Sequence, residues 1–330
     1  MISIKKKGDR RLKYLLTIFS LGLVVMVVAC NNNDVTDRAE SETDQSILPD
    51  YLADHFLDGK FEAIYNQTSD TFKDLVTLQQ FKDMGSNFNQ GVEHYEVISN
   101  MPFQGMTEIQ WLSDDGTKGI RSYFAEDDTI EGLQLLPVTP PQDRDDVYTE
   151  NTYRMPISGE WFVFWGGTNE LVNYHYELAQ QRYSYDLLVM EDGHSFEGDP
   201  TDNESYFAFG EDVLAPLDGV VVSVENGIAD NTPTIDTNAE NPLGNYVIIE
   251  HDNEEYSIIA HFKKESIVVS PGDEVAAGEL LGLVGNSGNS SEPHIHFQVS
   301  DGESFETSQS IRIQLENNAE PLRGDTVTGF

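Results

Sequence analysis

The sequence contains a single cysteine, Cys30, in 330 residues. One cysteine cannot form an internal disulfide, and it cannot supply the cysteine pair of a CxxC metal or redox site. Basic residues are also scarce, since 19 Lys and Arg face 58 Asp and Glu, for a net charge of −39. A surface of this sign repels a polyanion, so we expect no nucleic-acid partner.

Apolar residues are not scarce, and this argues against a globally disordered protein. Hydrophobic residues make up 38% of the chain and aromatic residues 10%, which is enough to bury a core and argues against global disorder. The sequence shows no internal repeat. Because domains commonly hold about 100–200 residues, the length predicts two domains.

The first 30 residues have the order of an export signal. Six basic residues within positions 5–13 precede an uncharged, mostly apolar stretch, residues 14–29, as in a signal peptide. The stretch has 16 residues, fewer than the ~20 that a spanning helix needs. It ends in Val27-Val28-Ala29-Cys30 and is followed at once by polar residues. An uncleaved membrane anchor with an incidental cysteine is the alternative to a cleaved signal.

This segment, residues 1–30, resembles a bacterial lipoprotein signal with its lipobox. The resemblance implies that Cys30 is lipidated and becomes the first residue of the mature protein, held at the extracytoplasmic face of the cell membrane. Loss of residues 1–29 removes six basic residues and one acidic residue, which leaves a net charge of −44. Residues 31–46 contain almost no apolar side chains, so they are predicted to form a flexible tether.

A small α+β domain is predicted over residues 47–137. Apolar residues recur at helical spacing between positions 51 and 84, and beyond Gly91 the pattern changes to the alternation of strands. The pattern resembles that of nuclear-transport-factor-like domains. His55 and His94 are isolated here, so we interpret this domain as a spacer or binding module.

Residues 138–155, with Pro140, Pro141 and a charged run, are predicted to be a linker. Short apolar segments separated by Gly, Asn and Pro then fill residues 156–330, which favours a mostly antiparallel β domain. The strands are expected at residues 183–190, 219–224, 246–250, 256–261, 280–284 and 294–299.

Two histidines in this β domain, His294 and His296, are two residues apart. Residues i and i+2 of a strand project from the same face, so both imidazoles can reach one metal ion or one water molecule. A His-x-His pair alone is a weak signal.

Five stretches give this pair a context. They are residues 213–221 (VLAPLDGVV), 244–251 (GNYVIIEH), 256–261 (YSIIAH), 269–278 (VSPGDEVAAG) and 282–298, which ends in PHIHFQ. In this order they resemble the motifs of lysostaphin-type (LytM-like) zinc metallopeptidases. The resemblance implies the β-rich fold of that family, of the duplicated-hybrid-motif type, and one zinc ion.

The resemblance also implies roles for individual residues. His296 and Asp186 correspond to metal ligands, and His261 and His294 to the catalytic pair that lines the site. A catalytic zinc takes three protein ligands, and many members have the third one four residues before the aspartate. Here that position is Arg182, which cannot ligate zinc because it stays cationic.

His175, eleven residues before Asp186, is therefore the predicted third ligand. A subset of the family has this longer arrangement. His194 is the reserve candidate, whereas His251 is expected to have a structural role. If His175 does not bind metal, the site is degenerate.

The function implied is that of a monomeric zinc metalloendopeptidase that hydrolyses peptide bonds in peptidoglycan stems or cross-bridges. The alternative is a catalytically degenerate module that binds the cell wall or regulates another protein.

Overall fold

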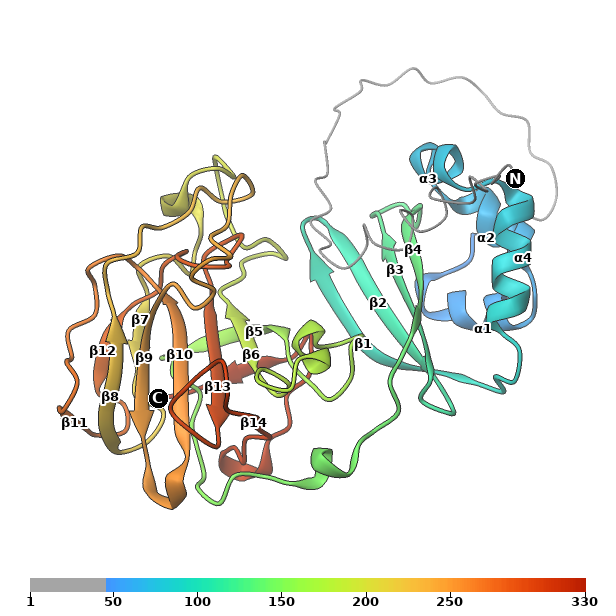
Figure 1. Ribbon diagram of the computed structural model, residues 1–330. Helices are drawn as coiled ribbons and strands as arrows, with labels where there is room; N and C mark the ends of the chain where they lie inside the picture. The colour runs from blue at the N-terminus through green and yellow to red at the C-terminus, as the bar shows by residue number, and fades with distance from the viewer. Residues whose placement is uncertain (1–45) are drawn as a thin grey trace, which may run out of the picture. The chain divides into compact units, whose positions relative to one another are not determined.

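The computed structural model of the protein describes residues 46–330 (Figure 1). The export signal, Cys30 and all but the last residue of the tether lie outside the described residues. Residues 46–330 belong to one compact unit. None of the helices found among residues 46–330 is long and apolar enough to cross a bilayer.

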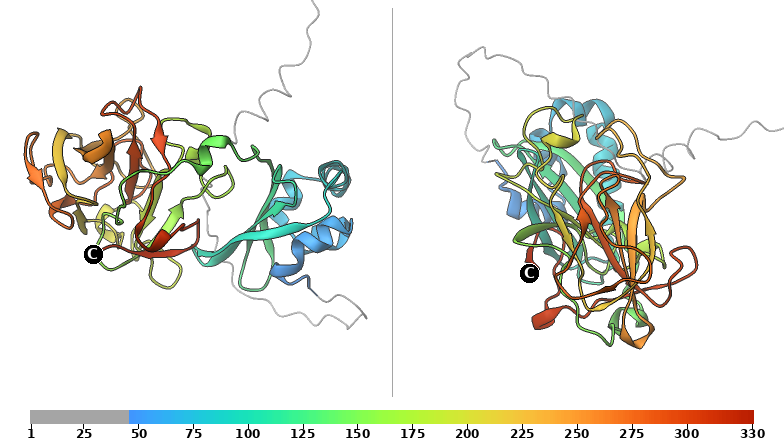
Figure 2. Two further views of the ribbon diagram at one scale, coloured as in Figure 1. Left: turned by 90° about the horizontal axis from the view of Figure 1, so that it is seen from below. Right: turned by 90° about the vertical axis from the view of Figure 1, so that its left-hand side faces the viewer.

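The N-terminal part consists of short helices and an antiparallel sheet, as the sequence predicts. The helices cover one face of this sheet (Figure 1, Figure 2). In chain order the elements are η1 (Pro49–Tyr51), α1 (Leu52–Leu57), α2 (Phe61–Gln67), α3 (Asp70–Leu75), α4 (Leu78–Phe88), β1 (Tyr95–Phe103), β2 (Met106–Ser113), β3 (Lys118–Phe124) and β4 (Ile130–Pro137). The strands lie in the order β1-β2-β3-β4. The similarity to nuclear-transport-factor-like domains stays a prediction.

Local sequence signals start the last two helices. The Ser69 side chain accepts a hydrogen bond from the Phe72 amide at the start of α3. Thr77 and Gln80 form a capping box at the start of α4. Phe81 of α4 is fully buried and meets the rings of Phe56, Phe61 and Phe72 edge-on, with centroid distances of 6.0–6.1 Å. These aromatic contacts hold the four helices together.

The C-terminal part is built almost entirely of antiparallel strands, which confirms the predicted β class. The elements are η2 (Asp143–Asp146), β5 (Glu160–Trp165), η3 (Tyr174–Glu177), β6 (Tyr185–Leu188), η4 (Asn203–Ser205), β7 (Asp212–Leu214), β8 (Gly219–Glu225), β9 (Asn245–Glu250), η5 (Asp252–Glu254), β10 (Tyr256–Phe262), β11 (Glu274–Val275), β12 (Leu280–Leu283), β13 (Ile295–Ser300), β14 (Ser310–Ile311), η6 (Glu316–Asn318) and β15 (Thr326–Thr328). One sheet has the order β11-β8-β9-β10-β13-β6-β5-β15, with β14 also paired to β13, and β12 pairs with β7.

The register of the large sheet brings the predicted site residues together. His296 of β13 lies directly opposite Asp186 of β6 and, on its other side, opposite Ala260 of β10. Paired residues project from the same face of a sheet. The side chains of His296 and Asp186 therefore share one face without any contribution from loops.

The four-stranded sheet packs its second face against the C-terminal part. Glu108 of β2 is fully buried and accepts hydrogen bonds from Nε and Nη2 of Arg323 at 2.7 and 3.0 Å. Burial alone raises the pKa of the Glu108 carboxyl, but the charge and hydrogen bonds of Arg323, together with Arg121, lower it to about 2. The Arg323 guanidinium in turn lies over the rings of Phe164 and Trp165. A buried, bidentate ion pair thus joins two segments that are far apart in the sequence.

Candidate metal centre

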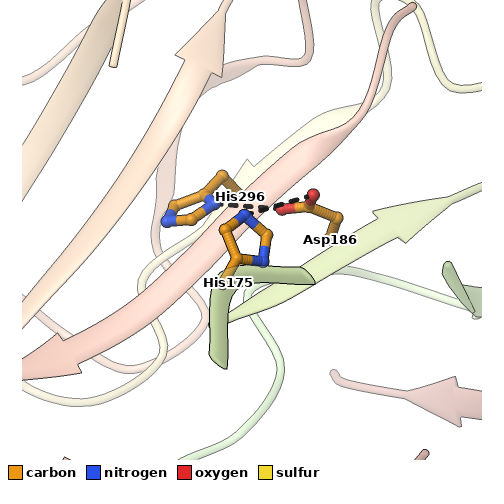
Figure 3. A group of neighbouring side chains, drawn as sticks. All are labelled: His175, Asp186 and His296. Carbon is orange, nitrogen blue, oxygen red and sulfur yellow. Dashed lines mark hydrogen bonds and ion pairs between the residues drawn. The ribbon is translucent and has the colours of Figure 1, made fainter. Parts of the chain in front are cut away.

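Three buried side chains form a group that could hold a metal ion: His175 from η3, Asp186 from β6 and His296 from β13 (Figure 3). Each offers a ligand atom within 4.8 Å of the other two, and each residue is at most 4% exposed. The Asp186 Oδ1 atom lies 3.0 Å from Nδ1 of His296, and its Oδ2 lies 3.5 Å from Nε2 of His175. The structure therefore brings together all three predicted ligands.

The His175 ring is oriented by Asn173. Nδ1 of His175 lies 2.9 Å from Oδ1 of Asn173. The Asn173 amide is fixed in this orientation because its Nδ2 lies 3.1–3.2 Å from the carbonyl oxygens of Gly167, Arg182 and Ser184. Because Oδ1 can only accept, Nδ1 of His175 carries the proton, and Nε2 of the neutral ring presents a lone pair toward Asp186.

The His296 ring has a corresponding partner in Gln298. Nε2 of His296 lies 3.0 Å from Oε1 of Gln298. The Gln298 amide is oriented by its own Nε2, which donates to the Gln180 carbonyl and the Ser300 hydroxyl at 2.8 Å. Nε2 of His296 is thereby the donor, and Nδ1 is left to face Asp186.

This donor set fits a divalent cation. Burial lowers the pKa of His175 to about 3, and His296 and His294 act in the same direction against the opposing effect of Asp186. His175 is therefore neutral at physiological pH. Its unprotonated Nε2 lies beside Oδ2 of the Asp186 carboxylate, so no proton is shared between the two atoms. Two histidine nitrogens and one carboxylate oxygen that converge in this way have the composition of a three-ligand zinc site.

The two remaining site histidines are adjacent to this group. The ring centroid of His261 lies 4.7 Å from that of His294 and 5.9 Å from that of His296. His261 has a φ of 70° at the irregularity where β10 pairs with β9, between Ala260 and Phe262. A histidine in the left-handed region is strained, and such strain is often found at functional sites.

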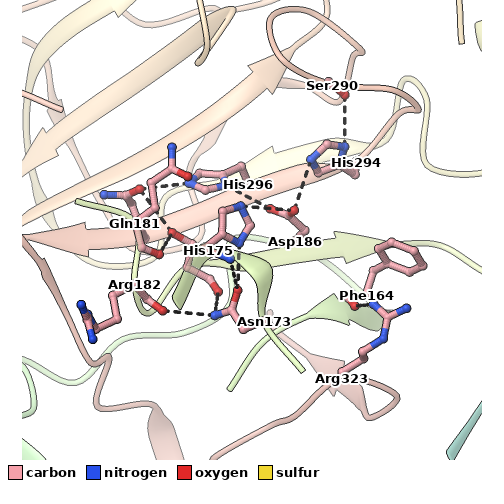
Figure 4. Close-up of polar contacts among 12 residues, drawn as sticks. Phe164, Asn173, His175, Gln181, Arg182, Asp186, Ser290, His294, His296 and Arg323 are labelled. Carbon is pink, nitrogen blue, oxygen red and sulfur yellow. Dashed lines mark hydrogen bonds and ion pairs between the residues drawn. The ribbon is translucent and has the colours of Figure 1, made fainter. Parts of the chain in front are cut away.

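Backbone carbonyl groups fix the tautomers of both rings. Nδ1 of His261 donates to the Ser287 carbonyl at 2.8 Å, and Nδ1 of His294 donates to the Glu292 carbonyl at 2.8 Å. Burial lowers the pKa of His261 well below its usual range, so this ring is neutral. Both Nε2 atoms are thus free of these hydrogen bonds, and that of His294 lies 3.8 Å from Oδ2 of Asp186 (Figure 4).

The other two histidines of interest lie outside the group. Nδ1 of His194 hydrogen-bonds to the Asp192 carbonyl in a half-exposed loop. His251 is buried between the Asp218 carbonyl and the Ser257 hydroxyl, at 2.8 Å from each. The Arg182 side chain points away from the three residues (Figure 4) and lies over the ring of Tyr176. The position that holds a histidine in many members of the resembled family thus contributes no ligand here.

Sequence reasoning assigned no role to Asn173 or Gln298. A signal was present, since each amide is two residues from the histidine that it orients. For Gln298 the spacing alone was informative, because it places the amide on the same face of β13 as His296. For Asn173, which caps a short 3₁₀ helix, no periodic pattern indicates the contact.

Comparison with known proteins agrees with this geometry. Residues 205–307 match the model of peptidase family M23. His261, His294 and His296 lie inside the matched segment, whereas His175 and Asp186 precede it. The match therefore supports the predicted family. The assignment of His175 and Asp186 rests on the sequence prediction and on their position beside His296 in the structure.

Two curated relatives are similar over a comparable length. Peptidoglycan DD-endopeptidase ShyA from Vibrio cholerae is 34% identical over 91 residues, which cover 27% of this chain and 17% of the relative. An uncharacterized metalloprotease from Buchnera aphidicola is 31% identical over 90 residues, 27% of this chain and 22% of the relative. The match thus spans about a fifth of these relatives' lengths. Together with the family match, these names support a peptidase.

Among solved structures, the catalytic domain of lysostaphin from Staphylococcus simulans is 20% identical, with a TM-score of 0.28. The alignment covers 46% of this chain and 88% of that domain. A TM-score of this size does not define a shared fold, so the inference rests on the family match and on the geometry of the site.

Proposed function

We propose that the protein is a zinc metalloendopeptidase that hydrolyses peptide bonds in peptidoglycan stems or cross-bridges. The observation that carries the proposal is the buried group of His175, Asp186 and His296 beside two further histidines of fixed tautomer. Three ligands with a fourth position open to water or substrate are the arrangement of catalytic zinc sites.

In this proposal His175, Asp186 and His296 hold the zinc ion. When bound, zinc supplies Lewis acidity toward the scissile carbonyl and the attacking water. Asn173 and Gln298 keep the two imidazoles in the tautomer that ligation needs. The Asp186 carboxylate supplies the anionic ligand, since its two oxygens face Nδ1 of His296 and Nε2 of His175 at 3.0 and 3.5 Å.

His261 and His294 move protons in the proposed reaction. With Nδ1 of each ring bound to a carbonyl oxygen, Nε2 is the atom that can accept a proton from the attacking water. A protonated Nε2 can then donate to the oxyanion or to the leaving amine. His294 is suited to contact substrate because its side chain is 12% exposed, whereas His261 is 5% exposed.

The choice of substrate follows from the relatives and the expected location. ShyA is named for its action on peptidoglycan, and an exported, membrane-anchored peptidase lies beside the cell wall. We expect the purified protein, loaded with one zinc ion per chain, to release new amino groups from isolated peptidoglycan. Dinitrophenylation of these amino groups, followed by mass spectrometry of the fragments, measures the cleavage and identifies the bond.

The control for this experiment is Asp186→Asn, which removes the ligand charge at nearly constant size. It is expected to lose both zinc and cleavage. Chelation of zinc should abolish cleavage by the wild type, and added zinc should restore it. A folded wild-type protein that binds no zinc would instead support the degenerate module that binds the wall or regulates another protein.

We also propose that Cys30 is lipidated and anchors the protein, as a monomer, to the extracytoplasmic face of the cell membrane. The support is the order of basic, apolar and polar residues around Cys30. Cys30→Ala is expected to abolish the lipid modification and release the protein from the membrane fraction. Metabolic labelling with a fatty acid measures the modification. Equal labelling of the variant would contradict the proposal.

A further inference from the structure

The segment that carries His175, residues 166–178, contains no strand. It follows β5, includes η3 and is shaped by its own hydrogen bonds. Oδ1 of Asn169 accepts from the amides of Leu171 and Val172 at 2.9 and 3.3 Å, and the Asn169 carbonyl accepts from the Asn173 amide at 2.9 Å. The other two proposed ligands differ, because Asp186 and His296 are paired directly within the large sheet. The place of His175 therefore depends on what this segment packs against.

The segment packs against the four-stranded sheet of the N-terminal part. The Leu171 side chain is fully buried, and it fills the space above Gly119 of β3. A Cβ atom at position 119 would lie only 1.9 Å from Cδ1 of Leu171. The Arg121 guanidinium donates to the Leu171 carbonyl, and the Thr139 amide donates to Oε2 of Glu170 at 3.1 Å. Gly119 and Arg121 of β3 and Thr139, two residues after β4, thus hold residues 170 and 171.

Arg121 is also connected to His175 through two aromatic rings. Its guanidinium lies 5.5 Å from the Trp165 ring, Trp165 meets Tyr174 edge-on at 5.2 Å, and Tyr174 lies 3.9 Å from the His175 ring. Arg121 is itself held beside the buried Glu108, with Nε 4.0 Å from Oε1. A row of packed side chains therefore leads from the face of the four-stranded sheet to the third proposed ligand.

We infer that the four-stranded sheet positions His175, with Gly119 and Arg121 as positioning residues of the metal site. The inference rests on the proposed function, and it gives the N-terminal part a role beyond that of a spacer. A shift of Leu171 would move the backbone that leads into Asn173 and His175, whereas Asp186 and His296 would keep their register. A misplaced third ligand weakens metal binding even when every ligand is present.

The test is Gly119→Ala in the otherwise unchanged protein. Because the new methyl group overlaps Leu171, we expect the affinity for zinc to fall by about 10–100-fold, the range typical for loss of an outer partner of a ligand. Competition with a chromophoric chelator measures the affinity. The visible absorption spectrum of the cobalt-substituted protein, which reports ligand geometry, is expected to change as well.

Gly132→Ala is the matched control. Gly132 of β4 lies opposite Tyr123 on the same face of the same sheet, and a Cβ there would lie 3.1 Å from Cδ2 of Tyr123 without reaching Leu171. Zinc affinity and the cobalt spectrum should stay at wild-type values in this variant. If Gly119→Ala fails to fold, Leu171→Ala decides, because it removes the same contact without overlap and is expected to weaken zinc binding in the same way.

The two proposals fail in distinguishable ways. A wild-type protein that binds no zinc overturns the proposed function. A wild-type protein that binds zinc, with a folded Gly119→Ala or Leu171→Ala variant of equal affinity and equal cobalt spectrum, overturns the positioning role alone.

Discussion

The His175→Ala protein is expected to lose stoichiometric zinc while keeping its fold. His175 supplies one of three proposed ligands, and its removal leaves Asp186 and His296, which are too few for a catalytic zinc site. The affinity should fall by more than the roughly 10–100-fold typical for loss of an outer partner. Asn173→Ala, which frees the His175 ring but keeps it, is expected to lie within that range. Metal content after dialysis and chelator competition measure both effects.

His194→Ala is the control for this prediction. His194 was the reserve candidate for the third ligand, and in the structure its ring is bound to the Asp192 carbonyl in a half-exposed loop. Zinc content should therefore be unchanged in this variant. The opposite pattern, with zinc lost from His194→Ala and kept by His175→Ala, would show that the third ligand has been assigned to the wrong histidine.

Much of this site could be predicted from the sequence, for a physical reason. Side chains along a strand follow a two-residue period, so the spacing of His294 and His296 indicated that both imidazoles reach one site, and His296 lies on β13. The motif order then supplied Asp186 and His261. Five strands of the large sheet, β6, β8, β9, β10 and β13, were predicted to within two residues at each end because their apolar runs stand out from polar neighbours. The predicted ranges did not include β5, β11, β14 or β15.

What the sequence did not indicate depends on long-range partners. Strand β3 has no clear apolar–polar alternation, because Ile120 packs with the helices while Arg121, on the other face, donates to the Leu171 carbonyl of the C-terminal part. Glu108 and Arg323 are 215 positions apart, and nothing in local periodicity selects one carboxylate and one guanidinium from so many charges. The contact between the four-stranded sheet and the His175 segment is of the same kind.

His294→Ala is expected to lose cleavage while it keeps zinc, which separates chemistry from metal binding. The ring lies next to Asp186, but it is not one of the three residues whose ligand atoms converge. Removing a positioned proton donor or acceptor typically costs ~10²–10⁴ in rate, and we expect a loss of that size in kcat. Single-turnover cleavage of a defined peptidoglycan fragment, with zinc content measured on the same sample, checks both halves.

His94→Ala is the matched control, because it removes an exposed histidine from the N-terminal part. Its cleavage rate and zinc content should equal those of the wild type. A zinc-loaded His294→Ala protein that cuts at the wild-type rate would leave His261 as the residue that transfers protons. A His294→Ala variant that loses zinc together with activity would instead mean that His294 supports the ligand Asp186, because Nε2 of His294 lies 3.8 Å from Oδ2 of Asp186. The division between ligands and proton-transfer residues would then have to be redrawn.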